Sequence, residues 1–148
     1  MIHLKVGDKA PLFNKIIESV PDFKERLIIF FYPKDNTPGC TAEACNLNNN
    51  YSSLLSEGFS ILGISPDNEK SHDKFKSKFD LKYPLIADME KEILNAYGVW
   101  GEKKMYGKSY QGVFRTTFVV NKQGIIERIF EKVETKEHTK QILEAYSK

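Results

Sequence analysis

The chain has 148 residues, a length typical of one domain. Hydrophobic residues make up 41% and charged residues 28%, which excludes a disordered chain, and the formal net charge of +2 is too small to indicate a nucleic-acid partner. The longest apolar run, residues 27–32, is far shorter than the roughly 20 residues of a membrane span, and the N-terminus lacks the pattern of a secretory signal. We therefore expect a single domain over residues 1–148, with no membrane and no nucleic-acid partner.

Strand and helix patterns alternate along the chain. The run 27–32 is continuously apolar, as in a strand that is covered on both faces. A polar turn then leads into a helix expected over 37–56, with Thr37 as its N-cap and Pro38 as its first residue. The elements expected after it are a buried strand 59–64, an exposed helix 68–79, a strand 84–87, a helix 89–97, a loop 98–114, a hairpin of strands 116–121 and 125–131, and a helix 135–146 with Thr135 as its cap.

This order of elements predicts the fold class. Alternating β and α units indicate an α/β protein with a partly parallel sheet, and the antiparallel hairpin near the end makes the central sheet mixed. We expect helices on both faces of that sheet. The order matches a thioredoxin-like fold with an insertion before the hairpin.

The sequence contains two cysteines, Cys40 and Cys45, which are five residues apart. Together with three scattered histidines they do not make the cysteine and histidine pairs of a zinc site, so no metal is expected. In an unbroken helix, positions i and i+5 lie about 8.7 Å apart at Cα and point about 140° apart, whereas a disulfide needs Cα atoms within about 6.8 Å. The two thiols can therefore coexist in a regular helix, and joining them requires that helix to unwind locally.

Cys40 lies about one turn into the expected helix, directly after a buried strand. The unpaired N–H groups and partial positive charge of a helix N-terminus favour a thiolate over a thiol. Such a thiolate, partly shielded by Pro33 and Pro38, is the nucleophile that peroxide chemistry needs. Its attack on a peroxide breaks the O–O bond, converts the sulfur to a sulfenic acid and expels water or an alcohol.

Two further residues are suited to support that reaction. Thr37, one turn ahead of Cys40, has a hydroxyl to offer to the thiolate or to the peroxide. Arg115, at the start of an expected strand, has a permanently charged guanidinium that suits a thiolate. Glu43 either complements the helix dipole or orients Arg115, and we leave it out of the predicted site. The three histidines have no spacing that suggests a role.

Residues 31–45, FYPKDNTPGCTAEAC, resemble the active-site segment of peroxiredoxins, and in particular the bacterioferritin-comigratory-protein (PrxQ) branch. The pattern Pro-x-x-x-Thr-x-x-Cys is present as Pro33, Thr37 and Cys40. Residues 112–120, GVFRTTFVV, resemble the segment that carries the family's active-site arginine, here Arg115. The resemblance covers nearly the whole chain. The stretch between Pro11 and residue 27 departs from it, because it is short and lacks the usual glycine-centred turn.

The resemblance implies a thioredoxin-dependent thiol peroxidase that acts on hydrogen peroxide or organic hydroperoxides. Cys40 would be the peroxidatic cysteine, and Cys45 the resolving cysteine that forms an intramolecular disulfide with it. Pro33, Thr37 and Arg115 would complete the catalytic site. A thioredoxin-type dithiol would reduce the disulfide, and no cofactor is implied because the sulfur carries the redox change.

Two other functions fit a reactive Cys40. A general thiol–disulfide oxidoreductase normally uses Cys-x-x-Cys, so the spacing of Cys40 and Cys45 argues against it. A non-enzymatic redox sensor also needs a reactive cysteine, and turnover with a reductant separates it from a peroxidase. Because both predicted redox residues belong to one helix, we expect a monomer, and because the thiols must cycle, we expect it in the cytoplasm.

Overall fold

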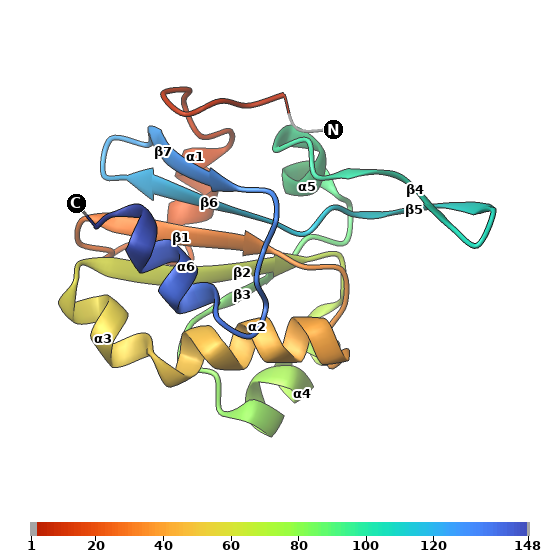
Figure 1. The fold of residues 1–148 in the computed structure, drawn as a ribbon, viewed down its shortest axis with the longest axis horizontal. Coiled ribbons are helices and arrows are strands. Elements are labelled where there is room, and N and C mark those ends of the chain that lie inside the picture. The colour runs from red at the N-terminus through yellow and green to blue at the C-terminus, as the bar shows by residue number, and fades with distance from the viewer. Residues whose placement is uncertain (1–2, 148) are drawn as a thin grey trace.

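The centre of the protein is a five-stranded mixed sheet, shown in Figure 1. The computed structural model describes residues 3–147. The strand order is β3-β2-β1-β6-β7. β1 (Arg26–Phe31) is parallel to β2 (Phe59–Ser65), which is parallel to β3 (Leu85–Ala87). On its other side β1 is antiparallel to β6 (Thr116–Asn121), which pairs antiparallel with β7 (Ile126–Phe130).

Helices cover both faces of this sheet, as the sequence predicts. Side chains of β1 alternate between the faces, with Leu27 in one core and Ile28 in the other. One core is covered by α1 (Phe13–Ile17) and α5 (Glu92–Ala96). The opposite core is covered by four helices: α2 (Pro38–Asn49), α3 (Tyr51–Ser56), α4 (Glu69–Phe79) and α6 (His138–Ala145). The α/β, thioredoxin-like fold class is confirmed. No helix among the described residues is long and apolar enough to span a membrane.

The helix expected over 37–56 is divided into α2 and α3 at Asn50. Asn50 leaves helical geometry, with φ −109° and ψ 14°, and its side-chain amide donates to the carbonyl of Asn46 at 2.8 Å. Asparagine side chains compete with backbone groups in this way, which explains the break in an asparagine-rich stretch. The expectation of one continuous helix is therefore wrong.

The segment 98–114, which we expected to be a loop, is a hairpin. Its strands are β4 (Trp100–Met105) and β5 (Lys108–Val113), and it extends away from the main sheet in Figure 1. Tyr106 and Gly107 form the turn, with φ values of 54° and 77°. A two-residue hairpin turn often needs positive φ at both central positions, and glycine supplies one of them at no steric cost. Most residues of these strands face solvent, so the sequence has no apolar alternation there that would predict a strand.

The last helix begins at His138, three residues after the cap we expected at Thr135. Residues 135 and 136 form a turn instead, in which the amide of Glu137 donates to the carbonyl of Glu134. This turn brings His138 into the core, where it is fully buried.

Candidate active site

Cys40 is the third residue of α2 and is fully buried. β1 delivers the chain to this point, and Pro38 occupies the start of the helix, where its missing N–H has no partner to lose. The Cys40 sulfur therefore lies in the first turn of a twelve-residue helix, close to its unpaired N–H groups. This is the position predicted for a reactive thiolate.

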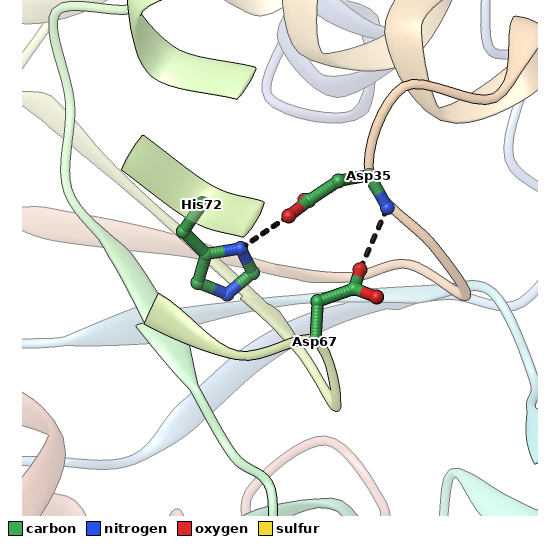
Figure 2. A group of neighbouring side chains, drawn as sticks. All are labelled: Asp35, Asp67 and His72. Carbon is green, nitrogen blue, oxygen red and sulfur yellow. Dashed lines mark hydrogen bonds and ion pairs between the residues drawn. The ribbon is translucent and has the colours of Figure 1, made fainter. Parts of the chain in front are cut away.

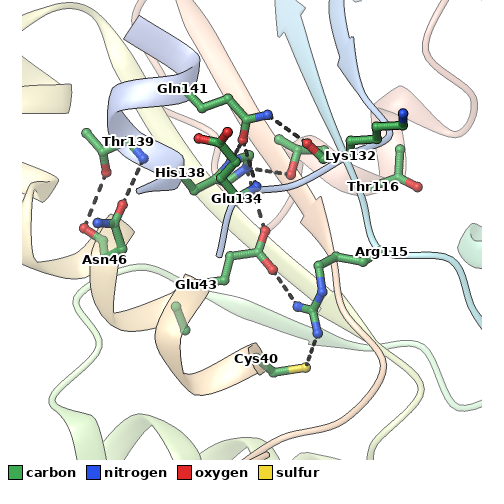
Figure 3. Close-up of polar contacts among 12 residues, drawn as sticks. Cys40, Glu43, Asn46, Arg115, Thr116, Lys132, Glu134, His138, Thr139 and Gln141 are labelled. Atoms are coloured by element: carbon green, nitrogen blue, oxygen red, sulfur yellow. Dashed lines mark hydrogen bonds and ion pairs between the residues drawn. The ribbon is translucent and has the colours of Figure 1, made fainter. Parts of the chain in front are cut away.

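Arg115 lies between β5 and β6 and is brought to Cys40 from 75 residues away (Figure 3). Its Nη2 donates to Cys40 Sγ at 3.2 Å, and its Nη1 donates to Glu43 Oε1 at 2.7 Å. Burial lowers the pKa of Arg115, but Glu43 and the Cys40 sulfur outweigh it and raise that pKa, so the guanidinium stays charged. Gly39 leaves room for this group, since a Cβ there would lie 3.2 Å from Arg115 Nη2.

Glu43 belongs to the site, although we left it out of the prediction. It lies one turn after Cys40 on the same face of α2 and is fully buried, so it does not serve as an exposed complement to the helix dipole. Burial raises its pKa to about 7, against the opposing effect of Arg115. The spacing of three residues from Cys40 was the signal in the sequence, and the burial was not visible there.

Cys45 lies in the same helix, half-buried, and both cysteines are free thiols. Burial raises the pKa of Cys45, so the intact helix favours its thiol form. Tyr83 holds this part of α2 in place by donating its hydroxyl to the carbonyl of Ala44 at 2.8 Å. Because α2 is regular between Cys40 and Cys45, the two sulfurs face different sides of it, and a bond between them requires the helix to open.

Thr37 and Pro33 lie in the segment between β1 and α2. Thr37 stands at the N-cap position, but its side chain makes no capping hydrogen bond. Its hydroxyl instead donates to the carbonyl of Lys34 at 2.8 Å, which holds the turn before α2 and leaves its oxygen lone pairs available. Pro33 is half-buried and lies two residues after the end of β1.

Asp35, between these two residues, anchors the segment to the rest of the fold (Figure 2). One carboxylate oxygen accepts from the Tyr32 hydroxyl at 2.6 Å, and the other lies 2.7 Å from His72 Nδ1. The Asp35 amide donates to Asp67 at 2.7 Å. Oxygen and nitrogen atoms of Asp35, Asp67 and His72 lie within 4.8 Å of one another, which is close enough for a metal ion, but each already has a partner within the protein.

His72 is held in its charged form by this arrangement. Its Nδ1 faces the Asp35 carboxylate, and its Nε2 lies 3.0 Å from the carbonyl of Ile86, so both nitrogens need a proton to satisfy their partners. Burial lowers the pKa of His72, but Asp35 and Ile86 outweigh it and raise that pKa. Burial likewise raises the pKa of Asp35, but His72, Tyr32 and Ser71 outweigh it and lower that pKa.

We expect His72→Gln to lower the free energy of unfolding by about 3 kcal/mol near neutral pH, because it removes one partner of a buried ion pair. His72 has a raised pKa in the folded state, so its contribution is complete below its unfolded pKa and is lost as the pH rises through the folded value. Asp35 has a lowered pKa, so its contribution is lost as the pH falls through its folded value. Denaturant unfolding across the pH range checks this, with exposed His3→Gln as the control. A destabilisation that is the same at every pH would contradict it.

Comparisons with known proteins show the family to which the chain belongs. Residues 6–129 match the model of the AhpC/TSA family. The chain is 38% identical over 146 residues to the "Putative peroxiredoxin bcp" of Coxiella burnetii, which covers 95% of this chain and 97% of that protein. A PrxQ mutant structure from Xylella fastidiosa superposes with a TM-score of 0.85 at 28% identity, over 97% of this chain and 96% of that one.

A third relative is the bacterioferritin comigratory protein of Xanthomonas campestris, whose solved structure concerns its alkyl peroxide reduction activity. It is 38% identical, with a TM-score of 0.76, over 82% of this chain and 78% of that one. The chain therefore belongs to the AhpC/TSA family and is a peroxiredoxin of the bacterioferritin-comigratory-protein (PrxQ) type, an enzyme with peroxidase activity.

Proposed function

We propose that this peroxiredoxin reduces hydrogen peroxide and organic hydroperoxides with Cys40 as the nucleophile and Cys45 as the resolving thiol. The observation that carries the proposal is the contact of Arg115 Nη2 with the buried Cys40 sulfur at 3.2 Å, at the N-terminus of α2. A guanidinium and a helix N-terminus both favour the thiolate. The alkyl peroxide activity described for the Xanthomonas campestris relative supports organic hydroperoxides as substrates.

The first half-reaction takes place at the sulfur of Cys40. The thiolate attacks one peroxide oxygen, an S–O bond forms and the O–O bond breaks, which leaves a sulfenic acid on the protein. The departing oxygen takes the electron pair of the broken bond and then a proton, and leaves as water or an alcohol. Arg115 is placed to stabilise the negative charge as it moves from the sulfur to the departing oxygen, because one of its nitrogens already contacts the sulfur. The lone pairs of the Thr37 hydroxyl are available to orient the peroxide.

The second half-reaction joins Cys45 to Cys40. The Cys45 thiolate attacks the sulfenic sulfur, an S–S bond forms, and hydroxide leaves and becomes water. In the closed helix, burial keeps Cys45 as a thiol, so opening α2 both brings the sulfurs within reach and exposes Cys45 to ionisation. Both cysteines belong to one helix, so the cycle needs no second chain, and we propose that the protein works as a monomer in the cytoplasm.

A thioredoxin-type dithiol completes the proposed cycle by reducing the Cys40–Cys45 disulfide. Two electrons pass from the dithiol to the protein disulfide, and the dithiol becomes oxidised. The reductant must reach sulfurs that the closed helix keeps apart, so reduction follows the opening of α2. A sensor role would show the same oxidation without sustained turnover.

The test compares the wild-type chain with Cys45→Ser. Peptide mapping of the wild type after a single equivalent of peroxide is expected to show the Cys40–Cys45 disulfide, and NADPH oxidation coupled through thioredoxin and its reductase is expected to continue. In Cys45→Ser we expect Cys40 to stop at the sulfenic acid, detectable by dimedone labelling, because no second thiol is present in the chain. Full thioredoxin-coupled turnover by Cys45→Ser would overturn the resolving role.

A further inference from the structure

One oxygen of the Glu43 carboxyl group has no hydrogen-bond partner among the described residues. Oε1 accepts from Arg115, but the buried Oε2 makes no hydrogen bond. Nε2 of His138, also fully buried, lies 3.6 Å from this oxygen (Figure 3). A buried carboxylate oxygen without a donor is costly, typically by about 1–3 kcal/mol or more. The arrangement around His138 therefore decides which form of Glu43 is stable.

The tautomer of His138 is fixed by Gln141. The Gln141 side-chain nitrogen donates to the carbonyl of Lys132 at 2.7 Å, and its oxygen accepts from the amide of Glu134 at 3.0 Å, so the orientation of the amide is set by the backbone. That same oxygen lies 2.8 Å from His138 Nδ1, which must therefore carry the hydrogen. Burial lowers the pKa of His138 to about 4, so the ring is neutral near pH 7 and Nε2 has only a lone pair.

The lone pair of Nε2 faces two oxygens. The Thr117 hydroxyl lies at 2.8 Å and donates its hydrogen to this lone pair, whereas Glu43 Oε2 lies at 3.6 Å, beyond hydrogen-bond distance. The Thr117 hydrogen is therefore not available to Glu43 Oε2. If Glu43 were ionised, a lone pair and a carboxylate oxygen would face each other in a site without solvent. A proton on Oε2 removes the charge and with it this repulsion. The cluster of Glu43, Thr117 and His138 thus has a place for one additional proton.

We propose that His138 is a positioning residue for the peroxidase reaction, which accepts the hydrogen of the Thr117 hydroxyl and leaves Glu43 Oε2 without a donor. It thereby favours the protonated form of Glu43 and determines how much of the Arg115 charge is left for Cys40. The inference rests on the proposed role of Cys40 as the nucleophile. Arg115 contacts both Cys40 and Glu43, so the two acidic groups compete for one cation. When Glu43 carries the proton, the guanidinium charge is directed to the thiolate.

The groups around the cluster allow Glu43 to gain or lose its proton near neutral pH when the charge of Cys40 changes. Burial raises its pKa to about 7. Tyr83, which faces it from the segment before β3, has its pKa raised well above its ordinary value by burial, so it stays neutral. His138 meets the edge of the Phe130 ring at a centroid distance of 5.9 Å, and this ring carries no charge. Lys103 on β4 also lies near Arg115 and Cys40, and burial and the charge of Arg115 lower its pKa. Arg115 stays charged, so among the groups that contact the guanidinium, Cys40 is the one whose state varies with Glu43.

Oxidation of Cys40 ends the competition between Cys40 and Glu43 for the charge of Arg115. The sulfenic acid is neutral, so Glu43 becomes the one anion that Arg115 holds, and its proton is released. In the complete step, thiolate, hydroperoxide and the Glu43 carboxylic acid give sulfenic acid, alcohol and the Glu43 carboxylate. The S–O bond forms, the O–O bond breaks, and the proton gained by the departing alkoxide is matched by the proton lost from Glu43. Catalysis and the protonation of Glu43 are coupled in this way.

The test uses His138→Gln in a Cys45→Ser background, where Cys40 is the single thiol. The glutamine amide can donate to Glu43 Oε2, which the lone pair of the neutral histidine cannot do. Glu43 then stays ionised to lower pH and competes for Arg115. We expect the midpoint of Cys40 alkylation by iodoacetamide to rise by about half a unit to one unit, which slows alkylation below that midpoint by roughly three- to tenfold.

Two controls separate this role from a general effect on packing. His3→Gln makes the same replacement at an exposed position and is expected to leave the alkylation profile unchanged. In a Glu43→Gln background the carboxyl group is gone, so His138→Gln should no longer shift the profile. An equal shift in both backgrounds, or none in either, would overturn the proposal. Alkylation does not require peroxide, so this outcome is independent of whether Cys40 proves to be the peroxidatic cysteine.

An infrared difference spectrum keeps the proposal testable if His138→Gln fails to fold. It compares the Cys45→Ser chain, whose residue 138 is unchanged, before and after a single equivalent of peroxide. We expect the band of a protonated carboxyl group to disappear on oxidation, and to be missing from the start in Glu43→Gln. A carboxyl band that is unaffected by oxidation would contradict the coupling between Glu43 and Cys40.

Discussion

Cys40→Ser is expected to reduce peroxide turnover by at least about 1,000-fold, because a serine hydroxyl ionises far less readily than a thiol and is a much weaker nucleophile for a peroxide. Cys40 is fully buried, and the serine side chain is slightly smaller, so the fold is expected to survive. Thioredoxin-coupled NADPH oxidation measures the loss, and circular dichroism confirms the fold. Cys45→Ser, with the same replacement in the same helix, is the matched control for the first step. It is also expected to lose the coupled turnover, but its Cys40 is still expected to consume one equivalent of peroxide, whereas Cys40→Ser consumes none.

The same comparison separates the functions that a reactive cysteine permits. A peroxidase loses sustained turnover in Cys40→Ser, whereas a sensor shows no sustained turnover even in the wild type. A general disulfide oxidoreductase would reduce insulin disulfides without peroxide, and the regular helix between Cys40 and Cys45 is unsuited to that activity. Turnover by Cys40→Ser within about tenfold of the wild type would contradict the assignment of the nucleophile.

The features of the site that could be predicted are those that depend on residues close together in the sequence or on a sequence motif. The position of Cys40 at the start of a helix followed from an apolar strand, a turn and Pro38, all of which are close together in the chain. Arg115 was identified from a motif, and its contact with Cys40 is made by the pairing of β1 with β6, which brings distant segments together. These features depend on strand and helix patterns that a sequence displays directly.

The buried polar groups behind the site could not be predicted in the same way. His138 gains its role from Glu43 on α2 and Thr117 on β6, and no regular spacing links these positions. His72 is similarly defined by Asp35, 37 residues earlier. A lone histidine in a polar segment gives no sign of whether tertiary packing buries it. We assigned no role to either histidine, and the structure places both in buried polar clusters.

The errors in the secondary structure have a related cause. The hairpin of β4 and β5 lies outside the core, so burial imposed no apolar alternation on it, and Tyr106 is 96% exposed. The division of α2 from α3 depends on a side-chain hydrogen bond at Asn50, which competes with the helix backbone. Hydrophobicity patterns indicate which residues are buried in the core. The hairpin lies outside the core and the helix break depends on a side-chain hydrogen bond, so neither leaves such a pattern.

Arg115→Lys is expected to lower the rate of Cys40 oxidation by peroxide by about 100-fold while the positive charge is retained. The reason is geometric, because two nitrogens of one planar group reach Cys40 Sγ and Glu43 Oε1 at 3.2 and 2.7 Å, and a lysine ammonium cannot reproduce this fork. Stopped-flow measurement of the first oxidation, with hydrogen peroxide and with an alkyl hydroperoxide, isolates this step from the reductant.

Arg26→Lys is the matched control for this variant. Arg26 also pairs with a glutamate, Glu127, at 2.7 Å, but it begins β1, whereas Cys40 follows the end of that strand. A loss of rate in Arg115→Lys alone would show that the fork acts on the reacting sulfur. Similar losses in both variants would mean that the arginine pairs serve only to stabilise the fold, and an unchanged rate in Arg115→Lys would show that charge without the fork is sufficient. Because Glu43 shares the same guanidinium, the variant should also shift the pH dependence of Cys40 alkylation toward higher pH, as a weaker hold on the thiolate requires.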